Sequence, residues 1–379
     1  MARFTLPRDI YHGKGCLEEL KNLKGKKAFL VVGGGSMKRQ GFLDKAVNYL
    51  KEGGMEVQLI EGVEPDPSVE TVMKGAKVMQ EFQPDWIVAM GGGSPIDAAK
   101  AMWTFYEYPD TKFEDLITPF GFPELRQKAK FAAIPSTSGT ATEVTAFSVI
   151  TNYQTGVKYP LADFNITPDV AIVDPDLVMG LPVKQVAYTG MDALTHAMEA
   201  FLNLFASRSV QNASIEAVCE NFHALPEAWR DGSRLAARQE MLHASYLAGF
   251  AFTNNFVGYV HAIAHAVGAL YHIPHGRANA VLLPAVLREY GSCIAPKLAV
   301  LADALSLGGD TVSEKAERMI AAIEAMRDSF DIPSTLPHLS PNDYTEIARR
   351  ALKEANPTYP VPQIWDSEKI FSVLRRVQS

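Results

Sequence analysis

Histidines gather in one short stretch of the chain, and a second stretch upstream has the same character. Four of the nine histidines lie within residues 261–276, which read HAIAHAVGALYHIPHG. Upstream, residues 192–196 read DALTH. Imidazole and carboxylate groups both bind divalent metals. We therefore hypothesise that the two stretches close on one metal, bound by Asp192, His196, His261 and His275.

The spacing of these side chains suits a shared ion. Residues four apart on a helix lie on one face, roughly 6 Å apart, so Asp192 and His196 can chelate one cation. His261 and His265 repeat this spacing on a later predicted helix. His275 stands between a proline and a glycine, which predicts a loop from which its ring can turn inward.

The hypothetical ligand set limits the metal and its chemistry. Three imidazoles and one carboxylate favour Fe(II), Zn(II), Ni(II) or Co(II), whereas Mg(II) prefers more oxygen ligands. Four protein ligands leave room for a substrate oxygen, as a Lewis-acid centre requires. The alternative for any one histidine is a hydrogen-bonded structural role, which we adopt for His12, His223, His243 and His338.

Two glycine-rich turns follow apolar runs in the first half. Residues 91–97 read GGGSPID, between a predicted strand and a predicted helix. Glycines let backbone N–H groups approach a phosphate closely, and the helix adds its positive end. The turn therefore predicts a pyrophosphate site, with an ordinary strand-to-helix turn as the alternative. Neither glycine turn has the common GxGxxG pattern.

The first glycine turn bears on the choice of nucleotide. Residues 33–39 read GGGSMKR and offer no acidic group for the 2′-hydroxyl of an adenosine ribose. The cations Lys38 and Arg39 could instead hold a 2′-phosphate. The alternative is a solvated helix start.

A cluster of hydroxyl groups follows the apolar residues 132–135. It reads STSGTATE over residues 136–143. Such a loop can donate several hydrogen bonds to a nucleotide, or it can satisfy its own backbone.

Strands alternate with helices in the first half, and helices alone fill the second. The apolar pattern predicts strands at 27–32, 57–60, 86–90, 132–135, 147–150 and 170–173, with helices at 41–50, 69–82 and 95–104. Such alternation predicts a parallel sheet. Later helices are predicted at 199–205, 214–225, 235–252, 259–270, 297–304 and 313–330. We expect a Rossmann-like α/β domain over residues 1–182 and an all-α domain over 183–379.

Composition narrows the class of protein. The chain has 379 residues, 47% of them hydrophobic and 21% charged, which is typical of a globular protein. A formal net charge of −7 argues against nucleic-acid and anionic-membrane partners. Three dispersed cysteines fit a reducing compartment. We see no secretory signal and no apolar run long enough to cross a bilayer, so we expect a cytoplasmic protein.

Together these motifs resemble the iron-containing (group III) alcohol dehydrogenase family, with its butanol, 1,3-propanediol and lactaldehyde types. In the second half the resemblance rests on DALTHAME at 192–199, His261-x3-His265 and HG at 275–276. In the first half it rests on GGGS at 91–94, IPSTSG at 134–139, EVT at 143–145 and KYP at 158–160. It spans nearly the whole chain. It implies a dehydroquinate synthase-like fold, with a dinucleotide-binding domain, a helical metal domain and a cleft between them.

The resemblance also implies roles for particular residues. It makes Asp192, His196, His261 and His275 the ligands of Fe(II), with Zn(II) as the alternative. It leaves His265 beside the substrate as a catalytic residue that moves protons or positions the alcohol. The implied pyrophosphate contacts are Gly92, Gly93, Ser94 and Asp97, and the nicotinamide contacts are Thr137, Ser138, Thr145 and Lys158. At the first turn we expect Gly34, Ser36 and Lys38 to contact the cofactor.

The implied activity is hydride transfer between a nicotinamide cofactor and a primary alcohol or aldehyde, by a homodimer. Many members carry Asp at the position of Gly33, which selects NAD(H), whereas members with GGGS there often use NADP(H), which we favour. One alternative is a dehydroquinate-synthase-like lyase, which would need basic residues near the metal; residues 251–274 contain none. The other is a non-catalytic metal-binding protein, which leaves the glycine turns and the hydroxyl loop unexplained.

Overall fold

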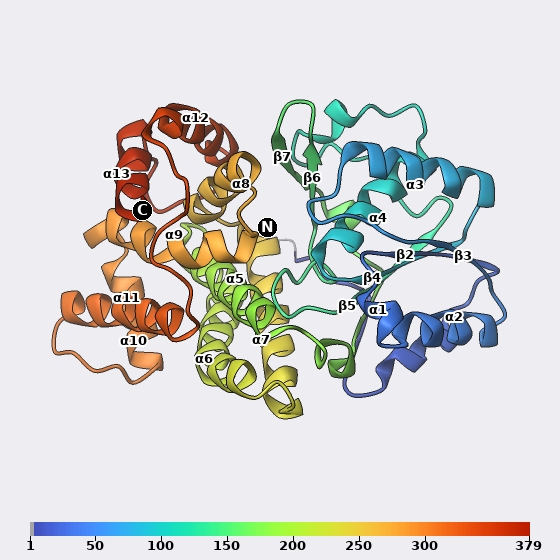
Figure 1. The fold of residues 1–379 in the computed structure, drawn as a ribbon, viewed down its shortest axis with the longest axis horizontal. Coiled ribbons are helices and arrows are strands. Elements are labelled where there is room, and N and C mark those ends of the chain that lie inside the picture. The colour runs from blue at the N-terminus through green and yellow to red at the C-terminus, as the bar shows by residue number, and fades with distance from the viewer. Residues whose placement is uncertain (1–3) are drawn as a thin grey trace. The chain divides into compact units, whose positions relative to one another are not determined.

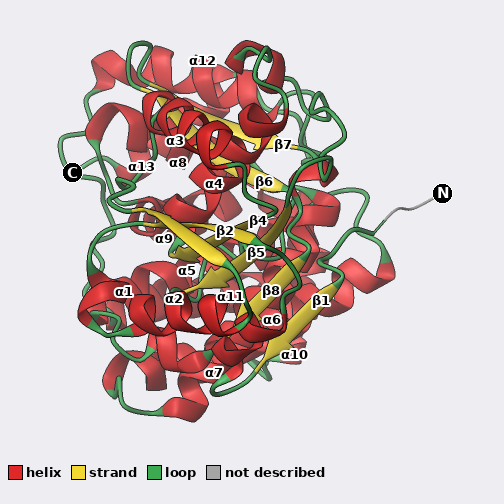
Figure 2. Ribbon diagram, turned by 90° about the vertical axis from the view of Figure 1, so that its right-hand side faces the viewer, coloured by secondary structure: helices red, strands yellow, loops and turns green. Residues whose placement is uncertain are grey.

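The computed structural model describes residues 4–379, and the chain divides after Leu181 into two compact units. The first is built on a parallel sheet with the strand order β1-β8-β5-β4-β2-β3 (Figures 1 and 2). The strands are β1 (Asp9–His12), β2 (Lys27–Val32), β3 (Glu56–Ile60), β4 (Trp86–Gly91), β5 (Lys130–Pro135) and β8 (Val170–Val173). The predicted Rossmann-like parallel sheet is confirmed, with β1 as a strand that we did not predict.

Helices cover both faces of this sheet, so its central strands are apolar on both sides. They are α1 (Ser36–Arg39), α2 (Phe42–Glu52), α3 (Val69–Phe82) and α4 (Gly93–Glu107). Along β2, Phe29 and Val31 join one buried cluster with residues of α3 and α4. Leu30 and Val32 join the other cluster with residues of α2.

A separate hairpin accounts for one predicted strand. We expected residues 147–150 to be a further strand of the alternating series. The structure instead pairs β6 (Phe147–Asn152) antiparallel with β7 (Val157–Ala162) in a two-stranded sheet. Residues 153–156 join the two strands, and so short a connection allows only antiparallel pairing, because parallel neighbours need a long crossover.

The second unit is helical, as predicted. Its helices are α5 (Val183–Leu202), α6 (Arg208–Arg230), α7 (Leu235–Asn255), α8 (Tyr259–Tyr271), α9 (His275–Tyr290), α10 (Ala295–Ala304), α11 (Val312–Ser329), α12 (Tyr344–Ala355) and α13 (Ser367–Val377). The helix predicted at 199–205 is the end of α5, which stops at Leu202. We did not predict α9, α12 or α13. Among residues 4–379, no helix is both long and apolar enough to span a bilayer.

Candidate functional site

Three of the hypothetical metal ligands converge inside the second unit. Asp192 lies on α5, His261 on α8 and His275 on α9, and their ligand atoms all lie within 4.8 Å of one another. The Asp192 Oδ1 atom is 3.4 Å from His275 Nε2 and 3.7 Å from His261 Nε2. Ligands about 2.1 Å from a tetrahedral cation lie about 3.4 Å apart. These distances therefore fit one shared cation.

The position of His275 differs from the expected loop. His275 is the first residue of α9, directly after Pro274. Proline fixes the backbone ahead of a helix start without needing a hydrogen-bond donor. The helix start holds the imidazole toward α5, so its placement depends on the packing of α5 against α9.

His196 lies next to this group but outside the three-residue set. It is one helical turn from Asp192, and both side chains are buried. Its ring stacks on His261 with centroids 4.4 Å apart, and on Phe252 with centroids 4.3 Å apart. The role of His196 as a fourth ligand stays a prediction.

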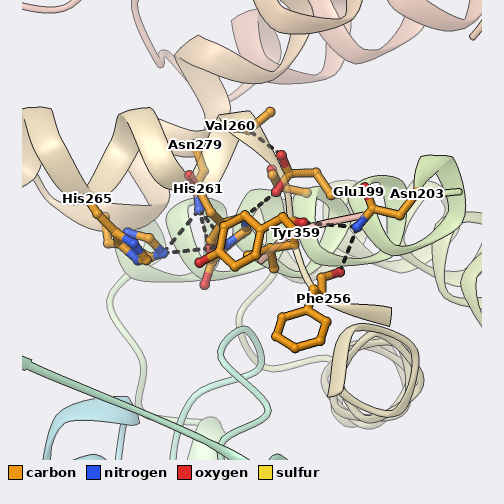
Figure 3. A network of polar contacts seen from close by, with 12 residues as sticks. Glu199, Asn203, Phe256, Val260, His261, His265, Asn279 and Tyr359 are labelled. Carbon is orange, nitrogen blue, oxygen red and sulfur yellow. Dashed lines mark hydrogen bonds and ion pairs between the residues drawn. The ribbon is translucent and has the colours of Figure 1, made fainter. Parts of the chain in front are cut away.

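Glu199, to which the sequence analysis gave no role, orients His261 (Figure 3). Its Oε2 atom lies 2.5 Å from His261 Nδ1, and its Oε1 atom accepts the Val260 N–H at 2.7 Å. A carboxylate on Nδ1 fixes the tautomer that leaves Nε2 as a lone-pair donor. The spacing of Asp192, His196 and Glu199 at i, i+4 and i+7 on one helix face is the signal that could have found it.

Asn279 is a second residue that sequence reasoning missed. Its Nδ2 atom lies 2.6 Å from Asp192 Oδ1 and 3.2 Å from each of His261 Nε2 and His275 Nε2 (Figure 3). Its Oδ1 atom is buried without a hydrogen-bond partner among residues 4–379. Three lone-pair atoms thus point at one small polar group, as they would point at a cation. Asn279 lies one helical turn after His275 on α9. Because the sequence analysis did not predict α9, it could not place Asn279 beside His275.

The charges around Asp192, His261 and His275 favour a positive charge between these side chains. Burial would raise the pKa of Asp192, but His196, His275 and His261 together hold that pKa well below its ordinary value. Burial lowers the pKa of His261, yet its interactions with the carboxylates of Asp192 and Glu199 raise that pKa to about 9. Two carboxylates in a buried pocket of imidazoles therefore favour a cation at this place.

His265 lies beside the group and is oriented by a different carboxylate. Its Nδ1 atom lies 2.9 Å from Glu354 Oε1, which also accepts a hydrogen bond from Tyr359 at 2.8 Å. Its ring stacks on His275 with centroids 5.2 Å apart. His265 is thus close to the hypothetical metal ligands without belonging to them.

Replacing Glu199 by Gln should weaken metal binding about 10- to 100-fold, because the amide no longer fixes the His261 tautomer as a carboxylate does. Chelator competition with Zn(II) measures this loss. The matched control is Glu354→Gln, which changes the same kind of contact on His265 and should leave the affinity unchanged. Equal losses of metal affinity in both variants would show that the contact of Glu199 with His261 has no particular effect on metal binding.

A second cluster of metal-binding groups is more exposed. Glu216, Glu220 and His243 have ligand atoms within 4.8 Å of one another, but Glu216 is exposed and the others are half-buried. His243 Nδ1 lies 2.8 Å from one Glu220 oxygen and 2.9 Å from the other. Solvent competes with ligands at such a surface, so the buried cluster is the stronger candidate.

The second glycine turn and the hydroxyl loop lie against each other in the first unit. Gly91 has a φ of 147°, which favours glycine, and α4 begins at Gly93 without a side-chain cap. A methyl group on Gly93 would come within 2.9 Å of Thr140, and one on Gly92 within 3.3 Å of Thr137. The uncapped N–H groups that begin α4 are therefore available to a phosphate beside the loop of hydroxyl groups.

The remaining predicted cofactor contacts differ in exposure. Ser138 and Thr145 are buried, whereas Ser94 and Thr137 are half-buried. The Asp97 carboxylate accepts hydrogen bonds from the Thr142 hydroxyl at 2.6 Å and the Val149 N–H at 3.0 Å. These bonds hold protein loops, and a contact of Asp97 with cofactor stays a prediction.

Two lysines among the predicted contacts form ion pairs. Lys158, on β7, is buried and lies 2.7 Å from Asp66. Lys38, on α1, is exposed and lies 3.1 Å from Glu61, just after β3. The first glycine turn lies beside the same segment, because Gly33 accepts the Gly62 N–H at 3.1 Å. Gly34 and Ser36 belong to this turn.

Comparison with known proteins gives a consistent picture across the chain. Family models described as iron-containing alcohol dehydrogenase, and as the C-terminal part of that family, match residues 7–175 and 186–378. An NADPH-dependent butanol dehydrogenase of Clostridium saccharobutylicum is 58% identical over 337 residues, which cover 89% of this chain and 86% of that protein.

Two further relatives also match most or all of this chain. The bifunctional aldehyde-alcohol dehydrogenase AdhE of Escherichia coli K12 is 39% identical over 367 residues, which span 89% of this chain but 41% of that protein. A crystal structure of 1,3-propanediol oxidoreductase has a TM-score of 0.94 with 35% identity and covers 100% of both chains. The match of both family models and the extent of these similarities show that the chain belongs to the iron-containing alcohol dehydrogenase family.

Proposed function

We propose that this protein interconverts primary alcohols and aldehydes, with Fe(II) as its metal and NADP(H) as its preferred cofactor. The observation that carries the proposal is the convergence of the buried Asp192 and His261 with the half-buried His275. The butanol dehydrogenase at 58% identity supports both a short-chain alcohol and NADPH. Zn(II) and NAD(H) are the alternatives within the same chemistry.

The residues at the centre fit a divalent transition metal. Asp192, His261 and His275 would hold it, with His196 as the fourth ligand, and Glu199 would orient His261. Such a metal supplies Lewis acidity, which lowers the pKa of an alcohol hydroxyl and polarises an aldehyde carbonyl. The nicotinamide ring accepts or supplies the hydride.

His265 is the residue that we propose for handling the proton. The contact between Glu354 and His265 Nδ1 favours a proton on that nitrogen, which leaves Nε2 to accept another. Its ring stacks on His275, so this nitrogen belongs to a residue that lies beside a proposed metal ligand. The buried surroundings of His261 and His265 limit the water that competes for the site.

In the first unit we propose that Gly92, Gly93 and Ser94 bind the pyrophosphate with the start of α4. Thr137, Ser138, Thr145 and Lys158 would bind the nicotinamide half, and Gly34, Ser36 and Lys38 the adenosine half. An ammonium group such as that of Lys38 favours a 2′-phosphate. Lys38 now pairs with Glu61, and both side chains are exposed, so replacing the Glu61 carboxylate by a phosphate as the partner of Lys38 costs little free energy.

Neither alternative activity gains support. The relatives described above are alcohol, aldehyde-alcohol and propanediol dehydrogenases or oxidoreductases. None of them is, by name, a lyase or a non-catalytic metal-binding protein.

The proposal is tested by reconstituting the protein with Fe(II) under anaerobic conditions and following NADPH and NADH oxidation with a panel of aldehydes. We expect short aldehydes such as butanal to be reduced, faster with NADPH at equal concentration. No reduction of any aldehyde by either cofactor would refute it.

Replacing Gly33 by Asp should shift the preference toward NAD(H). A Cβ on Gly33 meets only ordinary contacts, the nearest being Val63 O at 3.5 Å, so a side chain fits. A carboxylate beside a 2′-phosphate costs several kcal/mol, so the NADPH to NADH ratio of kcat/KM should fall by about tenfold or more. Gly33→Ala is the control, because it adds bulk without charge. An unchanged ratio in Gly33→Asp would remove this turn from the adenosine site.

We also propose a cytoplasmic homodimer. The reducing compartment rests on three free cysteines, and the dimer rests on the family resemblance alone. Sedimentation of the purified protein measures the oligomeric state directly.

A further inference from the structure

Lys100, in the middle of α4, is fully buried, which is rare for a lysine. Its Nζ atom donates to the main-chain oxygens of Thr145 and Phe147, both at 2.8 Å, and to the Thr142 hydroxyl at 3.0 Å. Removing an ammonium group from water costs several kcal/mol unless it is paired and fully hydrogen-bonded. Thr142 and Thr145 belong to the segment that joins β5 to β6, and Phe147 is the first residue of β6.

Asp97, one turn earlier on α4, is an anion that contacts both this segment and the start of β6. Its carboxylate accepts the Thr142 hydroxyl at 2.6 Å and the Val149 N–H at 3.0 Å, and its main-chain oxygen accepts the Ser148 hydroxyl at 2.8 Å. The Thr142 hydroxyl is therefore shared, because it accepts from Lys100 and donates to Asp97. A buried network in which each member has its partners fixes one geometry.

The two segments joined by this network are those with the proposed cofactor contacts. The start of α4 carries Gly92, Gly93 and Ser94, proposed for the pyrophosphate. The segment after β5 carries Thr137, Ser138 and Thr145, proposed for the nicotinamide half. Glycine at position 93 already allows the segment to approach α4, since a methyl group there would meet Thr140 at 2.9 Å. Lys100, further along α4, adds hydrogen bonds to the residues that follow β5.

We propose that Lys100 is a positioning residue that, through Thr142 and Asp97, sets the nicotinamide-binding segment relative to the pyrophosphate-binding start of α4. It acts through these groups and does not touch the cofactor. The inference deepens the proposed function and rests on it. If Lys100 served stability alone, its replacement would weaken the binding of every ligand of the first unit alike. If Lys100 has a positioning role, its replacement weakens only the binding of ligands that reach the segment after β5.

The test compares two ligands on Lys100→Met in the full-length protein. NADPH reaches both segments, whereas adenosine 2′-phosphate 5′-diphosphate has the pyrophosphate but no nicotinamide riboside. We expect NADPH to bind about tenfold more weakly, the loss of about one charged hydrogen bond, and the fragment to bind within about twofold of wild type. The turnover number should fall by up to about 100-fold, as for a misplaced reactant.

A second pair of variants keeps the test decisive if Lys100→Met fails to fold. Thr142→Val removes the shared hydroxyl and should produce a smaller loss of the same kind, and Thr142→Ser should restore wild-type binding. An equal loss of binding affinity for both ligands, or no loss of affinity for NADPH, would overturn the positioning role. A wild-type protein that binds the fragment but not NADPH, or neither, would instead overturn the proposed function.

Discussion

Replacing His261 and His275 together by alanine should remove the metal and nearly all of the alcohol oxidation activity. Each imidazole supplies one of the atoms that converge on Asp192, at 3.7 Å and 3.4 Å from its Oδ1. The remaining Asp192 and His196 cannot hold a cation against water at micromolar metal. A Lewis acid contributes several kcal/mol of stabilisation in the transition state, so the rate should fall by at least about 100-fold.

Metal analysis of the purified double variant measures this loss directly. The control is His223→Ala on α6, because the His223 side chain is 70% exposed and pairs with Glu240 on α7, away from the converging group. It should retain full metal content and activity. One metal per chain in the double variant would refute the ligand set, whatever its activity.

Replacing Gly276 by Ala should disturb the centre without changing any ligand. A Cβ at this position would come within 2.1 Å of the main-chain oxygen of Tyr188 on α5, a contact that no side-chain rotation relieves. The start of α9 must then move away from α5, and His275 moves with it. We expect destabilisation at or above the upper end of the usual range for overpacking, about 3 kcal/mol, together with loss of metal.

Denaturant unfolding and metal analysis measure the two effects. Gly232→Ala is the matched control in the same unit, because its Cβ would meet a side-chain atom, Arg238 Nη2 at 3.0 Å, and no main-chain atom. It should cost less than about 1 kcal/mol. If Gly276→Ala were as stable as Gly232→Ala and kept its metal, the close packing of α5 and α9 would not position His275.

Local patterns were enough to predict much of the fold. The continuous apolar runs of β2 and β4 indicate strands buried on both faces, and the glycine turns after them indicate where the helices begin. The four-residue spacing of Asp192 and His196 indicates a shared helix face, which α5 confirms. These features depend on neighbours within a few residues.

Features that depend on distant segments escaped prediction. His275 was expected in a loop because Pro274 and Gly276 flank it. The helix α9, which begins at His275, contains Pro284, and a proline is unfavourable inside a helix. Asn279 shows its role only when α5, α8 and α9 lie together, whereas the sequence places Glu199 on the helix face of Asp192 and His196 but does not show its partner His261. Residues 147–150 form a strand as expected, but antiparallel pairing with β7 depends on the short connection that follows.

The burial of Lys100 also depends on distant segments and could not be predicted. In the sequence it is one more cation in an apolar helix, and an exposed position would be the ordinary expectation. Its burial follows from three oxygens that lie more than 40 residues further along the chain. Only the packing of α4 against the segment after β5 reveals them.

The most direct measurement of the central claim titrates Fe(II) into metal-free protein and follows the rate of NADPH oxidation with butanal. If one cation held by a carboxylate and imidazoles supports the reaction, the rate rises in proportion to bound iron and levels off at one ion per chain. Metal-free protein that reduces butanal as fast as the loaded protein would contradict this account.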